Sequence, residues 1–151
     1  MAELRNDAGV LRFALEVAGR EAGGRLLVTA GLEYRDARDE SWWPVVRLPV
    51  LHLAGEALRG LEALLGALVA GAPDGFAWRP EDDPVFGLQL GPAPGGAVVE
   101  VGLDLGAFLA EVAGAPRRPE AELGLFRFRA GQADLVLFAD GLARELTAVG
   151  A

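Results

Sequence analysis

Alternating apolar and polar positions dominate the first part of the chain. Between residues 10 and 17 every second side chain is apolar, and the shared face is formed by Leu11, Phe13, Leu15 and Val17. A period of two is typical of a half-buried β-strand. Residues 26–34 repeat the pattern, and the glycine-rich segment between the two runs favours a turn. The pattern therefore predicts a β-hairpin.

A third alternating run follows at residues 44–53, after which the hydrophobic period changes. Pro49 has no amide donor, so it places this strand at the edge of a sheet. In residues 55–71 leucines recur at helical spacing, which predicts an amphipathic helix that ends near Gly71. The leucines of this stripe are Leu58, Leu61, Leu65 and Leu68.

The second half of the chain contains shorter alternating runs and a closing helical stripe. Strands are predicted at residues 76–80, 85–90, 97–105 and 122–130, and a helix is predicted at residues 132–149. Residues 106–113 stay open between a bent continuation of the preceding strand and a short helix. Residues 115–120, rich in proline and arginine, predict a loop.

Short, hairpin-like links join most of the predicted strands, so the sheet should be mainly antiparallel. We expect an α+β fold with one sheet of about seven strands and two helices packed on one of its faces. No composition break, linker or internal repeat divides the sequence. Residues 1–151 are therefore expected to form a single domain.

Composition and charge narrow the range of functions. Hydrophobic residues make up 52% of the chain, enough for a substantial core, and the formal net charge is −8. We expect no nucleic-acid partner and no membrane partner, because both need clustered positive charge. A basic protein partner is favoured instead. The most apolar stretch, residues 56–72, carries Arg59 and Glu62 and is too short to span a bilayer, so we expect a cytoplasmic location.

Side chains for catalysis are scarce. The chain has no cysteine, one histidine (His52) and one serine (Ser41), and no phosphate-binding loop follows any glycine-rich segment. A relay of serine, histidine and acid would need His52 beside Ser41, Thr29 or Thr147. We therefore expect no catalytic residue and no cofactor. An enzyme that uses carboxylates, with or without a metal ion, is the alternative.

Two acidic clusters are the candidates for that chemistry or for binding. The first contains Asp36, Asp39 and Glu40, and the second contains Glu81, Asp82 and Asp83. Carboxylate oxygens suit calcium or magnesium, but neither cluster has the alternating acidic residues and central glycine of an EF-hand loop. We expect no metal site in either.

Two adjacent tryptophans follow the first cluster. On an extended segment, the side chains of Trp42 and Trp43 point to opposite faces. In a purely structural interpretation, Trp43 enters the core and Trp42 lies over the aliphatic parts of neighbouring side chains. In the other interpretation, the outward tryptophan and the carboxylates form a surface that binds a basic partner. The residues predicted for this partner-binding surface are Asp36, Asp39, Glu40, Trp42, Trp43, Glu81, Asp82 and Asp83.

The segment "DESWWPVVRL" (residues 39–48) resembles the WapI-like immunity proteins of bacterial polymorphic toxin systems and related small domains of unassigned function. The resemblance continues through "LEALLGALVAG", "EDDPVFGLQL", "VVEVGLDL" and the closing "LFRFRAGQADLVLFADGLAREL". It implies a protein that binds and neutralises a cognate toxin domain. The second tryptophan departs from such proteins, which usually carry an aliphatic residue there. The alternative function is a non-catalytic structural or adaptor subunit, for which a homodimer through the edge strand at Pro49 is one form.

Overall fold

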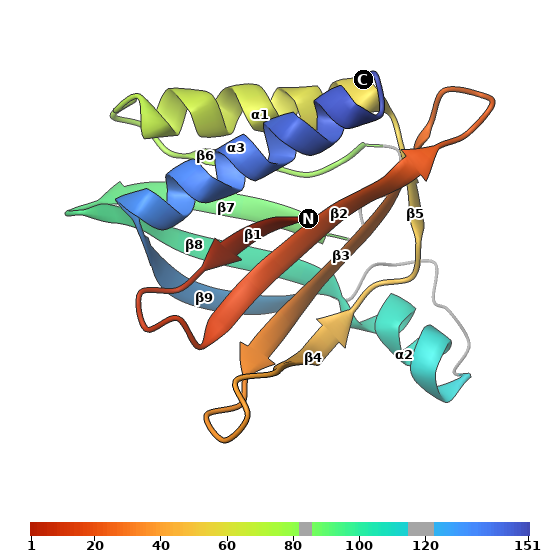
Figure 1. Ribbon diagram of the computed structural model, residues 1–151, viewed down its shortest axis with the longest axis horizontal. Helices are drawn as coiled ribbons and strands as arrows, with labels where there is room; N and C mark the ends of the chain where they lie inside the picture. Colours follow the sequence, from red (N-terminus) through yellow and green to blue (C-terminus); the bar gives the residue numbers. More distant parts are fainter. Residues whose placement is uncertain (82–85, 115–122) are drawn as a thin grey trace.

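The computed structural model describes residues 1–81, 86–114 and 123–151, and Figure 1 shows their arrangement. Within these residues there are nine strands and three helices. The strands are β1 (Ala2–Arg5), β2 (Leu11–Arg20), β3 (Leu26–Arg35), β4 (Trp42–Arg47), β5 (Leu51–Leu53), β6 (Phe76–Trp78), β7 (Phe86–Ala93), β8 (Gly96–Asp104) and β9 (Leu123–Gly131). The helices are α1 (Gly55–Val69), α2 (Leu105–Ala113) and α3 (Gln132–Ala148). All strand pairs in the described chain are antiparallel, so the α+β class with antiparallel sheets is confirmed.

The first five strands form sheet A, in the order β1-β2-β3-β4, with β5 also paired to β3. The predicted hairpin is present as β2 and β3, whose register places Phe13 opposite Leu32 and Ala14 opposite Gly31. The apolar positions that alternate along both strands are buried against the core, including Phe13, Leu15 and Val28. We call this buried side the inner face of the sheet and the opposite side its outer face.

The predicted third strand is split into β4 and β5, which lie end to end along the same side of β3. The break falls at Pro49, two residues after β4, because proline has no amide N–H to donate to the backbone hydrogen bonds between strands. The amide of Leu48 still donates to the carbonyl of Ala30 at 2.9 Å. The predicted edge position is therefore confirmed, and the proline interrupts the edge strand.

The second half of the chain forms sheet B, in the order β6-β7-β8-β9. Phe86 and Val101 are among the buried inner-face residues of this sheet. The rings of Phe13 on β2 and Phe86 on β7 are 6.0 Å apart, and that of Phe138 on α3 lies 6.1 Å from Phe13. The strands of the two sheets cross at a steep angle, and α1 and α3 run side by side along one side of the two sheets (Figure 1). Both sheets and both helices thus share one hydrophobic core.

Helix α3 packs on the edge strand β1, where Gly141 permits the close approach. A Cβ atom at Gly141 would lie 3.1 Å from the Cα atom of Ala2. The amino group of Met1 also pairs with Glu145 of α3, and a second oxygen of Glu145 accepts a hydrogen bond from the amide of Val17 at 2.5 Å. The helix therefore covers the β1 edge of sheet A.

The prediction of one sheet of about seven strands with two helices on one face is wrong in its arrangement. The described chain has two sheets of five and four strands, and α2 is a third helix. Alternation shows that each strand has one buried face, but that face can be buried against a helix or against a second sheet. Residues 106–113, which the sequence left open between strand and helix, belong to helix α2. The Asp104 side chain caps the start of this helix by accepting a hydrogen bond from the amide of Ala107 at 3.2 Å.

No helix in the described ranges is both long enough and apolar enough to cross a membrane.

Candidate binding surface

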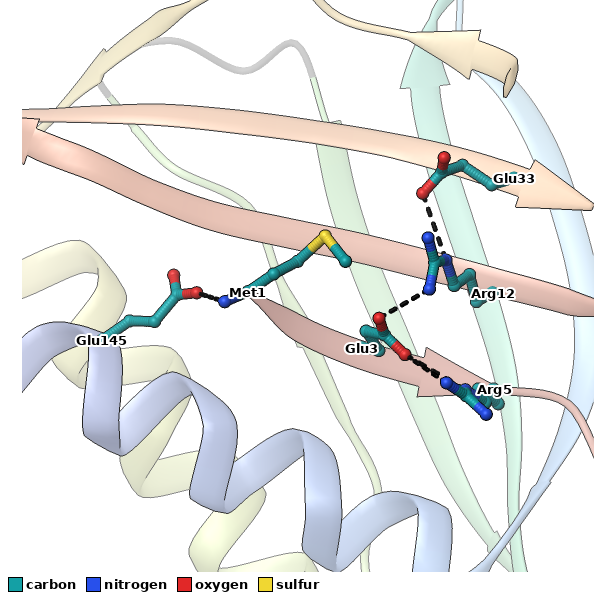
Figure 2. Close-up of polar contacts among 6 residues, drawn as sticks. All are labelled: Met1, Glu3, Arg5, Arg12, Glu33 and Glu145. Atoms are coloured by element: carbon teal, nitrogen blue, oxygen red, sulfur yellow. Dashed lines mark hydrogen bonds and ion pairs between the residues drawn. The ribbon is translucent and has the colours of Figure 1, made fainter. Parts of the chain in front are cut away.

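Trp42 lies on the outer face of sheet A, over a cluster of charged side chains. The Arg12 side chain is only 10% exposed, and its guanidinium carbon is 4.2 Å from the centre of the Trp42 ring. Its Nε donates to Glu33 at 3.1 Å and its Nη1 donates to Glu3 at 2.6 Å, so four strands contribute to one cluster. The second oxygen of Glu3 accepts a hydrogen bond from Arg5 at 2.8 Å (Figure 2).

This cluster gives Trp42 a structural role. A buried guanidinium must be paired with anions to offset its desolvation, and Glu3 and Glu33 provide them. The indole of Trp42 covers the guanidinium from one side, an arrangement stabilised by cation–π attraction. Trp42 therefore covers the Arg12 pairing on the outer face.

A hollow of about 330 Å³ lies beside this cluster on the same outer face. Its floor includes the small cross-strand pair Ala14 and Gly31. Its walls include Glu16, Thr29 and Arg47. Charges of both signs line it, so it does not select a ligand of one sign.

Trp43 lies on the opposite face of β4 and is exposed to solvent. It pairs across the strands with Tyr34 of β3, and the two residues are 51% and 44% exposed. Neither Trp42 nor Trp43 packs against the core cluster, although Trp78 does. Of the two interpretations, the one in which Trp43 enters the core is therefore wrong, and the outward tryptophan is Trp43.

Hydrogen bonds fix the orientation of the Trp43 indole. Its Nε1 donates to the hydroxyl of Ser41 at 2.7 Å, and that hydroxyl donates to Asp39 Oδ1 at 2.6 Å. The Ser41 amide donates to the same carboxylate oxygen at 3.0 Å. These bonds from Ser41, first the side chain and then the backbone, lower the pKa of Asp39 below 3.8, its ordinary value. The exposed indole is therefore held before any partner arrives.

The loop before Trp43 is ordered by its own carboxylates. Asp36 accepts a hydrogen bond from the amide of Arg38 at 2.8 Å, and Glu40 pairs with Arg35 at 3.1 Å. Glu40 adopts a φ of 60°, a left-handed conformation that a non-glycine residue adopts only at a cost. Asp36, Asp39 and Glu40 thus shape the tip of the hairpin beside Trp43. We call Tyr34, Trp43 and residues 36–41 the hairpin surface.

Of the second acidic cluster, the structure describes only Glu81. Glu81 follows β6 of sheet B, whereas the hairpin surface belongs to sheet A. Asp82 and Asp83, also predicted for partner binding, lie outside the described residues. The structure therefore brings together five of the predicted binding positions on the β3–β4 hairpin, although Trp42 and Trp43 face opposite ways.

His52 pairs with a glutamate and not with Ser41. It lies on β5, and its Nδ1 is 3.0 Å from a carboxylate oxygen of Glu21 in the β2–β3 turn. The hydroxyl of Ser41 is engaged by Asp39, on a different hairpin. In the described part of the chain, no group of three or more histidine, aspartate or glutamate side chains is arranged to hold a metal ion.

The sequence pattern does not show the role of two residues of the site. Alternation places Tyr34 on the same face as Leu32, and its exposure follows only from its place at the end of that face. Alternation places Arg12 on the polar face of its strand, and its burial comes from Glu3, Glu33 and Trp42 on neighbouring strands. The spacing of Trp43 and Tyr34 across one short loop is the signal that could have found the pair.

No protein family matches the sequence, and no curated protein matches it. Solved structures that resemble the fold include the following two. One is the plant transcriptional regulator PBF-2, with 10% identity, a TM-score of 0.48 and coverage of 93% of this chain and 78% of that one. The other is WHY3 from Arabidopsis thaliana, with 12% identity, a TM-score of 0.47 and coverage of 95% and 85%.

These similarities correct one expectation. The prediction that the chain has no nucleic-acid partner is contradicted, because a structure that resembles it is that of a transcriptional regulator. We withdraw the exclusion of nucleic acid. With TM-scores below 0.5, the likeness does not assign that activity to this chain.

Proposed function

We propose that this protein is a non-catalytic binding protein that neutralises a cognate bacterial toxin domain through the hairpin surface. The observation that carries the proposal is the exposed Trp43 indole, which Ser41 and Asp39 hold in one orientation. Tryptophan and tyrosine are enriched among the residues that dominate binding energy. A side chain that is already ordered loses little further conformational entropy on binding.

The charge of the whole chain favours a basic partner. The net charge of −8 accelerates association with a positively charged protein. The carboxylates of the hairpin surface are partly offset by Arg38 within it and by the adjacent Arg35, which pairs with Glu40. The loop carboxylates therefore contribute mainly by fixing Trp43, and the net charge contributes to the association rate.

The toxin as partner rests on the resemblance of residues 39–48 and later segments to immunity proteins. The test is co-expression of this chain with a toxic C-terminal domain encoded beside its gene, followed by a measurement of growth and of the dissociation constant. We expect rescue of growth, and a complex that Trp43→Ala weakens by about thirtyfold, which corresponds to about 2 kcal/mol. Leu137→Ala is the matched control, because Leu137 is an exposed apolar residue on α3.

Three outcomes would count against the proposal. Failure to rescue growth or to form a complex would exclude the toxin as partner. Equal affinities of the Trp43→Ala and Leu137→Ala variants would exclude the hairpin surface. A tight homodimer with Trp43 buried in it, detected by light scattering and a blue-shifted emission, would favour the adaptor subunit instead.

A further inference from the structure

The outer face of sheet B carries a hollow that the proposed function does not use. Its volume is about 290 Å³. Gly87 on β7 pairs with Gly102 on β8, and Gly102 pairs with Leu125 on β9, so these three residues form one row across the sheet. Leu123 and Leu125 form one wall, and Arg79, which follows β6, lies at the other side. We call this site the glycine hollow.

The fold does not require a residue without a side chain at position 102, on the floor of the hollow. A Cβ atom there would lie 3.5 Å from methyl carbons of both Leu123 and Leu125, which is ordinary van der Waals contact. A glycine inside a strand also weakens it relative to alanine. An alanine at this position would therefore fit, and its side chain would occupy part of the hollow. The absence of a side chain leaves the leucine wall free for a ligand.

The wall itself is apolar and exposed. Leu125 is 65% exposed, which is the largest exposed fraction among the large apolar residues that the structure describes. Exposed apolar side chains beside a concave floor are typical of protein interaction sites. An apolar group placed on the glycine floor would cover the Leu125 side chain.

The charge of the hollow is positive on one side. A Cβ atom at Gly87 would lie 3.5 Å from Nε of Arg79, so the guanidinium group lies against the floor. Arg79 is exposed and makes no ion pair with any other residue that the structure describes. Glu100, at the rim, already pairs with Arg127 at 3.2 Å. Among the residues that the structure describes, the hollow therefore has one positive charge, that of Arg79, without an ion-pair partner.

We propose that the glycine hollow docks a segment of a partner polypeptide in which a bulky apolar side chain is next to a carboxylate. The apolar side chain would lie on Gly87 and Gly102 against Leu125, and the carboxylate would pair with Arg79. A protein is the fitting source, because a shallow site covers too little of a free small molecule, whereas sites for small ligands enclose most of the ligand. The site is independent of the hairpin surface, which belongs to the other sheet.

The test uses capped dipeptides and the leucine methyl resonances of the intact protein. Acetyl-Phe-Asp-amide, acetyl-Phe-Asn-amide and acetyl-Phe-Lys-amide are titrated at millimolar concentration. We expect saturable shifts of the Leu123 and Leu125 methyls with the aspartyl peptide. We expect affinity roughly two- to fivefold lower for the asparaginyl peptide, as for a partly exposed ion pair, and lower still for the lysyl peptide.

Two variants connect the effect to the hollow. Gly102→Ala should weaken all three peptides by filling the floor, while Gly66→Ala on α1, where a Cβ atom meets nothing within 4 Å, should leave them unchanged. Arg79→Gln should abolish the preference for aspartate over asparagine. The proposal is overturned by an absence of saturable shifts, by a preference that survives Arg79→Gln, or by methyl shifts that an oligothymidylate produces and the peptides do not.

Discussion

Replacing Arg12 with methionine removes a guanidinium group from the outer face of sheet A and keeps an apolar stem of similar length. The variant loses two charged hydrogen bonds, at 3.1 Å to Glu33 and 2.6 Å to Glu3, and the stacking on Trp42 at 4.2 Å. Each such hydrogen bond contributes roughly 1.5–3 kcal/mol. Removing one partner of a fully buried pair costs about 3–5 kcal/mol.

The expected loss is smaller because the two acids are not fully buried. The side chains of Glu3 and Glu33 are 23% and 14% exposed, so water solvates them once the guanidinium is gone. Arg5 still pairs with Glu3, and methionine regains contact with the indole. We therefore expect the free energy of unfolding to fall by about 2–3 kcal/mol. For a chain of this length that lowers Tm by roughly 4–12 °C.

Urea unfolding followed by circular dichroism measures the change. Arg47→Met is the matched control, because Arg47 is an exposed arginine on the same sheet, and its effect should stay within about 0.5 kcal/mol. The double variant Arg12→Met, Glu33→Gln should be more stable than Arg12→Met alone, since Arg5 still pairs with Glu3 and the carboxylate that Arg12 leaves without a partner is removed. Equal losses for Arg12→Met and Arg47→Met, or a double variant less stable than the single one, would refute the pairing as the stabilising interaction.

Three further predictions concern the hairpin surface and the helix packing. Trp43→Ala should change the free energy of unfolding by no more than about 1 kcal/mol, because Trp43 is half exposed and the variant loses chiefly the cross-strand contact with Tyr34. A thermal melt measures this change. The pKa of Asp39 is lowered in the fold, so the ionised Asp39 stabilises the protein above the ordinary value of 3.8, and this stabilisation is lost as the pH falls through the lowered pKa. A carboxyl titration by NMR should show the lowered pKa. Ser41→Ala should move it back toward 3.8. Gly141→Ala should lower the free energy of unfolding by roughly 1–3 kcal/mol, because the new Cβ atom would crowd Ala2 on β1. A melting temperature equal to that of Gly66→Ala would contradict the close packing of α3 on β1.

The local structure was largely predictable because most elements have a clear hydrophobic period. The alternating residues of β2 and β3 and the leucine stripe of α1 appear as strands and helix close to the predicted ranges. The split into two sheets was not predictable from these patterns, because a half-buried strand has the same alternating sequence whether a helix or a second sheet covers its buried face. Helix α2 was ambiguous because its sequence, "LGAFLAEVA", is apolar at nearly every position and shows no clear period.

The candidate site was predictable in its residue types and not in their roles. Adjacent positions on a strand face opposite ways, so one outward tryptophan was expected. Which of the two faces outward depends on contacts across strands. Glu3 and Glu33 are far from Arg12 in sequence and hold it beneath Trp42, while Trp43 lies where the inner face of sheet A is no longer covered.

Hydrogen exchange of the complex with a rescuing toxin domain tests the central claim most directly. We predict slower exchange of the amides at residues 33–45 on complex formation, together with protection of the Trp43 indole N–H, and unchanged exchange in β7 and β8. Protection confined to other strands, with the Trp43 indole still exchanging freely in the complex, would contradict binding through this surface.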